Sequence, residues 1–260
     1  MADTGAVQVE LNAVVTKRVP LSDDLWLLHV RPEGWSLPSF KPGQYCTIGL
    51  PDESGKLIRR VYSIASPPSA EELELYIVVV KEGQLTPRLY KLKEGDRLFL
   101  GKKIVGLFTL DDVPRDQNIV FAGTGTGIAP YMSMLRSGLA KETSRKTSLI
   151  HGVRFSPDLS YTVELETMAR DNPRFVYVPL VSRPHLNPTP WSGPTGHVQD
   201  VWNGGVIEKA WGFKPQPAHT RVFLCGNPAM IKDMTSLLEK EGFKEHSRKS
   251  PGQIHVEKYW

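Results

Sequence analysis

The sequence predicts two domains of different classes, an N-terminal antiparallel β-barrel followed by a C-terminal α/β domain with a parallel sheet. Two observations lead to this prediction. Residues up to about 108 contain short strand-like runs separated by glycine and proline turns, with one helical segment, which is typical of an antiparallel barrel. From residue 109 onward, strand patterns alternate with helical patterns, which is typical of a parallel sheet with helices on both faces. We therefore expect a barrel over 1–108 and an α/β domain over 109–260.

The expected strands of the barrel are rich in β-branched, aromatic and alternating residues. They are Val7–Lys17, Leu25–Val30, Tyr45–Leu50, Arg60–Ala65, Leu73–Val80 and Arg97–Leu100. The one helical segment is Leu85–Leu92, where Thr86 is a candidate cap and Pro87 lies in the first turn.

The α/β half predicts four strands and four helices in alternation. The strands are Asn118–Gly123, Ser148–Val153, Arg174–Leu180 and Arg221–Cys225, and the helices are Tyr131–Lys141, Tyr161–Asp171, Val198–Lys209 and Ala229–Glu241. A long loop over 184–196, rich in proline, glycine and tryptophan, interrupts the series.

Composition excludes several classes of protein. The chain has 260 residues, of which 40% are hydrophobic and 23% charged, as in a soluble globular protein. Two cysteines supply neither a disulfide framework nor a zinc or iron–sulfur ligand set, so we expect no metal. No apolar run approaches the roughly 20 residues of a membrane span, and the N-terminus lacks the pattern of a signal peptide, which indicates the cytoplasm.

The formal net charge of +4 is spread along the chain, without a polybasic block of the kind that binds nucleic acid. This favours an acidic protein partner over DNA. Plain solubility is the alternative explanation.

The segment Arg60-Val61-Tyr62-Ser63 combines a cation, an aromatic ring and a hydroxyl on one expected strand. Side chains alternate along a strand, so Arg60 and Tyr62 are expected on the same face. A flavin nucleotide needs such a set, because charge binds its pyrophosphate, a ring packs on its isoalloxazine and a hydrogen bond is made near the reactive nitrogen. An ordinary amphipathic strand is the alternative.

The turn Gly123-Thr124-Gly125-Thr126-Gly127 lies between an expected strand and an expected helix. Glycines allow a ligand to approach the backbone, and a helix N-terminus favours a pyrophosphate. The turn matches neither the GxGxxG fingerprint nor a P-loop, so its position at the carboxyl end of a strand is the stronger signal.

Three further groups of residues follow expected strands or the end of the chain. Arg154 and the pair Ser182-Arg183 follow strands and suit the 2′-phosphate of NADP, although isolated surface arginines are commonly only solvated. Cys225-Gly226-Asn227-Pro228 ends the last expected strand, with Asn227 as a helix cap. No activating base is adjacent to Cys225, so it is not read as a nucleophile. The ending Tyr259-Trp260 exposes two aromatic rings unless they bind something.

In combination, Arg60–Ser63, Gly125–Pro130, Cys225–Pro228 and the ending Val256-Glu257-Lys258-Tyr259-Trp260 resemble the bacterial ferredoxin (flavodoxin)–NADP⁺ reductases, in the right order over nearly the whole chain. The resemblance implies an FAD-binding barrel, an NADP-binding α/β domain and a flavin in the cleft between them. It also implies hydride exchange between NADP(H) and FAD, coupled to one-electron exchange with ferredoxin or flavodoxin, in a monomer.

The resemblance assigns candidate residues to each nucleotide. For FAD they are Arg60, Val61, Tyr62, Ser63, Leu75, Ile77, Gln84, Leu85, Thr86, Thr126, Tyr259 and Trp260. For NADP they are Thr126, Gly127, Val153, Arg154, Ser182, Arg183, His197, Cys225, Gly226, Asn227 and Pro228. The candidate catalytic residues are Ser63 and Cys225, with Glu257 as a candidate for tuning or proton delivery, and Tyr259 is expected to cover one flavin face as a gate.

One position departs from the family pattern. The chain has Thr195-Gly196-His197 where the family commonly has an arginine after Thr-Gly. Because histidine is neutral above its ordinary pKa of about 6.5, NADPH preference is expected to be weaker or pH-dependent, with Arg183 retaining it. Three rivals are an oxygenase-type reductase, disfavoured because such proteins carry a four-cysteine cluster, a non-catalytic FAD- and NADP-responsive binding protein, and a free flavin reductase.

Overall fold

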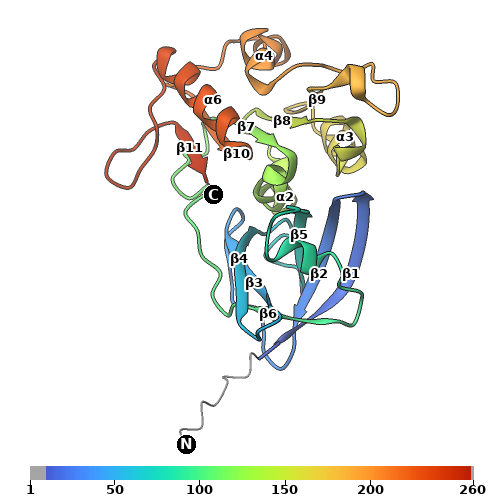
Figure 1. Ribbon diagram of the computed structural model, residues 1–260. Coiled ribbons are helices and arrows are strands. Elements are labelled where there is room, and N and C mark those ends of the chain that lie inside the picture. The colour runs from blue at the N-terminus through green and yellow to red at the C-terminus, as the bar shows by residue number, and fades with distance from the viewer. Residues whose placement is uncertain (1–9, 259–260) are drawn as a thin grey trace, which may run out of the picture.

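The structure is a computed structural model that describes residues 10–258. Its N-terminal half forms an antiparallel sheet and its C-terminal half a parallel sheet flanked by helices, and the two halves meet along a shared interface (Figure 1). The predicted two-domain architecture is confirmed. The expected boundary between residues 108 and 109 lies in the segment that connects the sheets, and its exact position stays a prediction.

Within the described residues the N-terminal half forms a six-stranded sheet in the order β4-β3-β6-β1-β2-β5. An antiparallel bridge between Ile64 and Leu75 joins the end of β4 to β5 and closes the sheet into a barrel. The elements are β1 (Ala13–Ser22), β2 (Leu25–Pro32), β3 (Tyr45–Pro51), β4 (Leu57–Ser63), β5 (Leu73–Val78), the single helical turn α1 (Thr86–Leu89) and β6 (Arg97–Leu100).

Strands β2 and β5 are buried on both faces, which explains their nearly continuous apolar sequences. On β2, Trp26 and Leu28 pack in the barrel core, whereas Leu25 and Leu27 pack in a cluster shared with the α/β domain. On β5, Tyr76 likewise faces that shared cluster. Alternation along the strand therefore directs one set of side chains into the barrel and the other toward the second domain.

In the described part of the C-terminal half, five parallel strands lie in the order β11-β10-β7-β8-β9. The strands are β7 (Asn118–Thr124), β8 (Thr147–Val153), β9 (Phe175–Val181), β10 (Thr220–Cys225) and β11 (Ile254–Glu257). The α-helices are α2 (Ala129–Arg136), α3 (Thr162–Asp171), α4 (Val198–Asn203), α5 (Val206–Trp211) and α6 (Pro228–Lys240). Short 3₁₀ turns η1 to η4 lie at Gly125–Ile128, Leu139–Lys141, Ser156–Asp158 and Pro184–Leu186.

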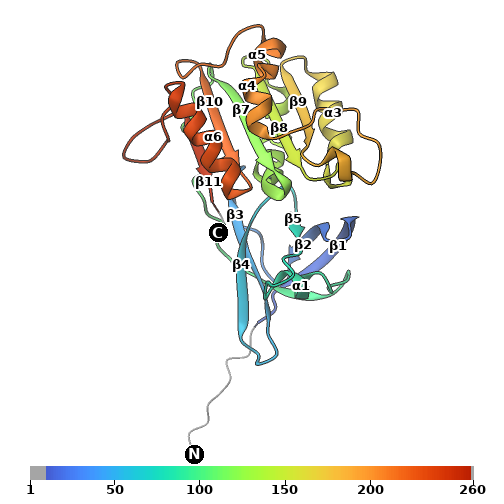
Figure 2. The same ribbon diagram turned by 45° about the horizontal axis from the view of Figure 1, so that its top comes forward.

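The helices cover both faces of the parallel sheet, as Figure 2 shows. Helices α2 and α3 pack with Phe121, Leu149 and Phe223 on one face, and α4, α5 and α6 pack with Val120 and Ile150 on the other. Consecutive strand residues thus enter different cores, as expected of a buried parallel sheet.

Helix α2 joins the two domains through polar contacts as well as packing. Arg136 donates from Nη1 to the carbonyl oxygen of Ala65 at 3.1 Å and to Oε1 of Glu74 at 2.8 Å. Ser133 donates to the carbonyl oxygen of Ser66 at 2.8 Å. The segment that follows Ser63 in the barrel is therefore held directly by the helix that follows the glycine-rich turn.

Several expected boundaries were wrong for identifiable reasons. The first strand runs over Ala13–Ser22 instead of Val7–Lys17, and residues 7–9 lie outside the described range. The expected helix Tyr131–Lys141 begins earlier, at Ala129 with Pro130 in its first turn, and ends at Arg136, before Gly138 adopts φ 114°. The expected helix Val198–Lys209 is two helices, because Gly204 and Gly205 end α4 and Gly205 turns left-handed at φ 64°.

Two further expectations differ from the structure. Thr86 does not cap α1: its hydroxyl accepts a hydrogen bond from the Val80 amide at 2.8 Å and so anchors the preceding loop. The ending was read only as a tail, yet Ile254–Glu257 forms strand β11 beside β10. Asn227 does cap α6, as expected, and accepts from the amides of Ala229 and Met230.

Candidate active site

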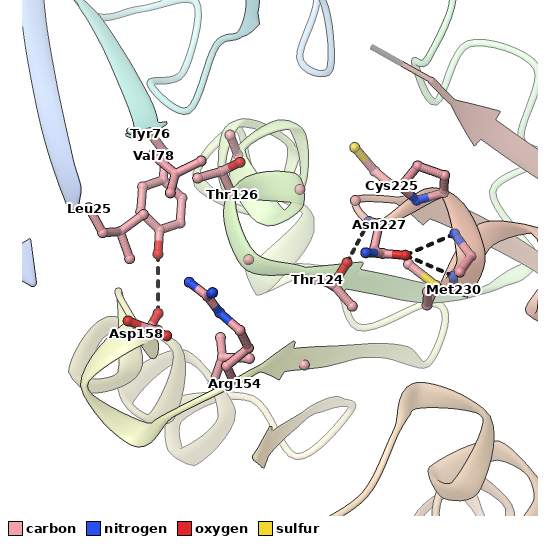
Figure 3. A pocket seen from close by; sticks show the side chains of 18 of the residues that line it. Leu25, Tyr76, Val78, Thr124, Thr126, Arg154, Asp158, Cys225, Asn227 and Met230 are labelled. Atoms are coloured by element: carbon pink, nitrogen blue, oxygen red, sulfur yellow. Dashed lines mark hydrogen bonds between the residues drawn. The ribbon is translucent and has the colours of Figure 1, made fainter. Parts of the chain in front are cut away.

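A large cleft of about 1460 Å³ lies between the two domains and is lined by residues of both. This exceeds the roughly 300–1,000 Å³ of a typical small-molecule pocket. Barrel strands β4 and β5 contribute one wall, and the carboxyl ends of β7, β8, β9 and β10 contribute the other. Figure 3 shows Tyr76 and Leu25 facing Arg154 and Thr126 across this space. In open α/β sheets the carboxyl ends of the strands are where ligands bind.

Strand β4 presents Arg60, Tyr62 and Ser63 to the cleft. Arg60 is exposed, so its guanidinium is accessible to an anionic ligand. Tyr62 packs against the barrel core, and burial raises the pKa of its phenol, which stays neutral. Ser63 is buried and donates from Oγ to Oε2 of Glu257 at 3.3 Å. A cation, a neutral ring and a hydroxyl therefore follow one another along a single wall.

The glycine-rich turn after β7 packs against the turn after β10. A Cβ on Gly127 would lie 2.5 Å from the carbonyl oxygen of Cys225, and one on Gly226 would lie 2.2 Å from Oγ1 of Thr124. Thr124 also accepts a hydrogen bond from the Asn227 amide at 2.7 Å (Figure 3). Gly127 and Gly226 must therefore be glycine because the two turns are in contact and leave no room for a side chain. The sequence had suggested only that glycines here let a ligand approach the backbone.

Gly125 has a different reason for being glycine. It adopts φ 54°, and a Cβ there would meet nothing within 4 Å. It lines the cleft with its backbone open to that space, so it is the position in this turn where a ligand can approach the main chain.

Backbone hydrogen bonds tie three loops together at the carboxyl edge of the sheet. The Ser182 amide donates to the carbonyl oxygen of Val153 at 2.9 Å, and the Arg183 amide donates to that of Arg154 at 3.1 Å. The Gly196 amide donates to the carbonyl oxygen of Val181 at 3.1 Å. Arg154, Arg183 and His197 therefore stand on adjacent loops that all line the cleft.

The side chains of Ser182 and His197 already have contacts within the protein. The Ser182 hydroxyl donates to the carbonyl oxygen of Val153 at 3.0 Å. His197 is 74% exposed, with Nδ1 3.7 Å from Oδ2 of Asp200, and its amide donates to the same carboxylate at 2.7 Å.

Cys225 ends β10 beside Glu257, its register partner on β11. Burial raises the pKa of the Cys225 thiol well above its ordinary value, and the Glu257 carboxylate adds to this. The side chain is therefore a neutral thiol, which agrees with the reading that it is not a nucleophile.

Most of the residues proposed from the sequence meet at this cleft. Those that line it are Arg60, Val61, Tyr62, Ser63, Ile77, Gln84, Leu85, Thr86, Thr126, Gly127, Val153, Arg154, Ser182, Arg183, His197, Cys225, Gly226, Asn227 and Pro228. Leu75 is fully buried in the barrel core, and Glu257 lies behind Ser63. Tyr259 and Trp260 lie outside the described residues.

Sequence reasoning missed several lining residues. Tyr76 and Val78 alternate with the chosen Leu75 and Ile77 on β5, and the same alternation could have placed them on the face toward the second domain. Acidic side chains were also missed, because no local pattern marks them; they are Asp24, Asp158, Asp200 and Asp233.

Comparison with known proteins assigns both domains. Residues 12–102 match the model of the oxidoreductase FAD-binding domain, and residues 121–236 match that of the oxidoreductase NAD-binding domain. A flavodoxin/ferredoxin–NADP reductase of Escherichia coli is 34% identical over 248 residues, which cover 95% of this chain and 97% of the relative. A reductase of the same name from Buchnera aphidicola (Schizaphis graminum) is 32% identical and covers 96% of this chain and 98% of the relative.

The chain belongs to the flavodoxin/ferredoxin–NADP reductase family. It is an FAD-dependent oxidoreductase of this family, with an FAD-binding barrel and an NADP-binding α/β domain. A solved ferredoxin NADP⁺ reductase of Neisseria gonorrhoeae with bound FAD and NADP superposes with a TM-score of 0.84 at 27% identity and covers 96% of this chain and 98% of its own.

The residues that line the cleft are of the kind that binds the phosphate groups of nucleotides. Arg60, Arg154 and Arg183 place guanidinium groups along the cleft, and Gly125 leaves its main chain open to the same space. In residues 10–258 no group of three potential ligands could hold a metal ion. In the same range no helix is both long enough and apolar enough to cross a bilayer.

Proposed function

We propose that this chain exchanges electrons between NADP(H) and a small acidic carrier, ferredoxin or flavodoxin, through FAD bound in the interdomain cleft. The observation that carries the proposal is that residues of both domains line opposite walls of one cleft. The β4 wall with Arg60, Tyr62 and Ser63 faces the turns that hold Thr126 and Cys225 in the same cleft. The bound FAD supplies the redox chemistry, because it exchanges a hydride with the nicotinamide and single electrons with the carrier.

On the flavin wall each residue has a distinct role in this proposal. Arg60 binds the FAD pyrophosphate, and neutral Tyr62 packs on the isoalloxazine. Ser63 lies near the reactive nitrogen; its hydroxyl has a single proton, which it donates to Glu257 in this structure and redirects to the flavin when FAD binds. Residues of the β5–α1 segment complete the FAD site in the proposal; they are Ile77, Gln84, Leu85 and Thr86. Leu75, proposed from the sequence as an FAD contact, is fully buried in the same core cluster as Ile77 and Leu85 and supports them from behind. Tyr259 and Trp260 remain proposed FAD contacts outside the described residues.

On the other wall the proposal assigns the NADP contacts. Thr126, Gly127 and the turn Gly226-Asn227-Pro228 bind the pyrophosphate and nicotinamide end. Arg154, Ser182, Arg183 and His197 bind the adenosine 2′-phosphate, with Val153 beside them. The neutral Cys225 positions the nicotinamide by contact, since its buried thiol is not ionised.

The proposed partner is an acidic protein, in keeping with the net charge of +4 and with the names of the relatives. A monomer in the cytoplasm is part of the same proposal. A binding protein without catalysis is the alternative of another class, and turnover with an artificial electron acceptor separates the two.

The test is an anaerobic titration of the purified protein, first with NADPH and then with NADH, followed by visible absorption. Bleaching of a bound flavin at low NADPH, with a far weaker response to NADH, supports the proposal. A colourless protein that takes up no added FAD would overturn it. Equal bleaching by NADPH and NADH would instead indicate a reductase without coenzyme preference.

A further inference from the structure

A charged cluster joins the two domains at the rim of the cleft. Asp24 in the β1–β2 turn of the barrel places Oδ2 3.9 Å from Nη2 of Arg154, which follows β8 in the other domain. The Ser22 hydroxyl lies 3.3 Å from Oδ1 of Asp158 and 3.5 Å from Oδ1 of Asp24. Both Asp24 and Arg154 line the cleft, and Figure 3 shows Arg154 extending into it.

The acidic side of this cluster is anchored by the barrel domain. The carbonyl oxygen of Asp24 accepts a hydrogen bond from the Val79 amide at 2.7 Å, which fixes the turn against β5. The hydroxyl of Tyr76, on β5 itself, donates to the carbonyl oxygen of Asp158 at 3.2 Å. Arg154 is the accessible partner, since 54% of its side chain is exposed, against 38% for Asp24.

The cluster contains two carboxylates, those of Asp24 and Asp158, and one guanidinium, that of Arg154. Burial raises the pKa of Asp158, and the nearby Asp24 charge raises it further, whereas the Ser22 hydrogen bond and the Arg154 charge lower it. An anion that approaches Arg154 therefore meets Asp24 and Asp158 beside it. Both repel a 2′-phosphate, and Asp24 also competes for the guanidinium.

We propose that Asp24, contributed by the FAD-binding domain, is a specificity-determining residue that restrains Arg154 and so weakens selection for the 2′-phosphate of the coenzyme. The inference rests on the proposed function, because it takes Arg154 as a 2′-phosphate contact. Asp24 touches no reacting atom and acts only through Arg154. A coenzyme without the phosphate does not need the guanidinium released, so its affinity is independent of Asp24.

The test measures binding of two probes, adenosine 2′,5′-bisphosphate and 5′-AMP, to the FAD-loaded protein by isothermal titration calorimetry. Asp24→Asn is expected to bind the bisphosphate about threefold to fivefold more tightly, the scale of one exposed ion pair. Affinity for 5′-AMP stays unchanged. The gain shrinks at high salt, because exposed charges are screened.

Asp23→Asn is the matched control, since Asp23 is the neighbouring exposed aspartate and does not line the cleft. It is expected to leave both affinities at the wild-type values. Asp24→Ser, a second variant with a small polar side chain, should reproduce the effect of Asp24→Asn. Thermal unfolding and FAD content of all variants show whether they are folded and loaded.

Equal bisphosphate affinity in wild type and both Asp24 variants would overturn the inference. Weaker binding in the variants would overturn it as well, because Asp24 would then orient Arg154 for the ligand. A parallel change in 5′-AMP affinity would show a general structural effect, which is also contrary to the proposal. If the wild-type protein binds neither probe, the proposed function fails, and that result is distinct from binding without dependence on Asp24.

Discussion

The Ser63 hydroxyl on β4 donates a hydrogen bond to the Glu257 carboxylate on β11, across 194 positions of the chain and across the domain interface, at 3.3 Å. The bond places an acidic side chain of β11 directly behind the β4 wall of the cleft. Glu257 is also the register partner of Cys225 on β10. Both walls of the cleft therefore depend on where β11 lies.

Replacement of Ser63 by alanine should reduce both turnover and stability. Loss of a hydrogen bond to a carboxylate costs about 1.5–3 kcal/mol of unfolding free energy. Turnover of NADPH with an artificial acceptor should fall about 10²-fold, the lower end of the range for removal of a preorganised hydrogen-bond donor at a reacting group. Urea denaturation and steady-state kinetics measure the two effects.

The control for this change is Ser54→Ala, which removes an exposed hydroxyl that is bonded to Asp52 at 2.6 Å and does not line the cleft. It should leave turnover unchanged. A Ser63→Ala protein with wild-type turnover would remove Ser63 from the proposed mechanism.

The two cysteines are expected to be inert in the folded protein. Burial raises the pKa of Cys46 to about 12 and that of Cys225 well above its ordinary value, so almost no thiolate exists at pH 8. Ellman's reagent should react with neither thiol in the native protein and with both after denaturation. Rapid native labelling of Cys225 would contradict the neutral thiol described above.

Stability should fall as the pH drops below about 6.5. Burial lowers the pKa of His151 to about 4, and burial together with the nearby His246 and Arg221 lowers that of His255 to about 3. Both are below the unfolded value of about 6.5, so between these values the unfolded chain binds protons that the folded protein does not. The contribution is full above pH 6.5 and is lost as the pH falls toward the folded values.

Urea midpoints between pH 7.5 and pH 4.5 measure this dependence. His255→Leu should reduce its slope by up to about one proton, because one of the two depressed groups is removed. His185→Ala, at an exposed position, should leave the slope unchanged. An identical slope in the His255 variant would show that other groups cause the dependence.

Replacement of Arg136 by glutamine should strongly destabilise the contact between the domains. Arg136 is 18% exposed and pairs with Glu74 at 2.8 Å and Glu164 at 2.7 Å. Its removal leaves Glu74, 12% exposed, without that partner, and breaking a buried pair in this way costs about 3 kcal/mol. Guanidinium denaturation measures the loss. Arg170→Gln, which alters an exposed pair, should change stability by less than about 0.5 kcal/mol.

Strand and helix order could be predicted because hydrophobic periodicity is local. The strand Arg97–Leu100 was predicted with its observed bounds, and β7 differs from its prediction by one residue. The predicted helix ends were less accurate where a glycine ends the helix, as at Gly205. A hydrophobic pattern does not show whether a glycine adopts a left-handed conformation. Strand β11 was missed because four residues carry too little periodicity and its stability comes from pairing with β10.

Within the site, residues adjacent in the chain were found and residues adjacent only in space were not. Arg154 was recognised because it follows a strand, whereas its partner Asp24 stands more than a hundred positions away in the other domain. Likewise, Gly127 was assigned to a ligand, although the carbonyl oxygen of Cys225 already excludes a side chain there. Contacts between distant segments depend on the whole fold, which single-sequence patterns do not encode.

Helix α2 contributes Met132, Leu135 and other buried side chains to a cluster that also contains Leu25 and Tyr76 of the barrel. Side chains of both domains therefore form this part of the hydrophobic core, so neither domain can be exchanged as an independent module. A barrel transplanted onto another α/β partner, or expressed alone, would carry an uncovered apolar face that invites aggregation. Recombination between relatives should tolerate crossovers in the surface loops far better than at residues 101–117, where the chain passes from one sheet to the other.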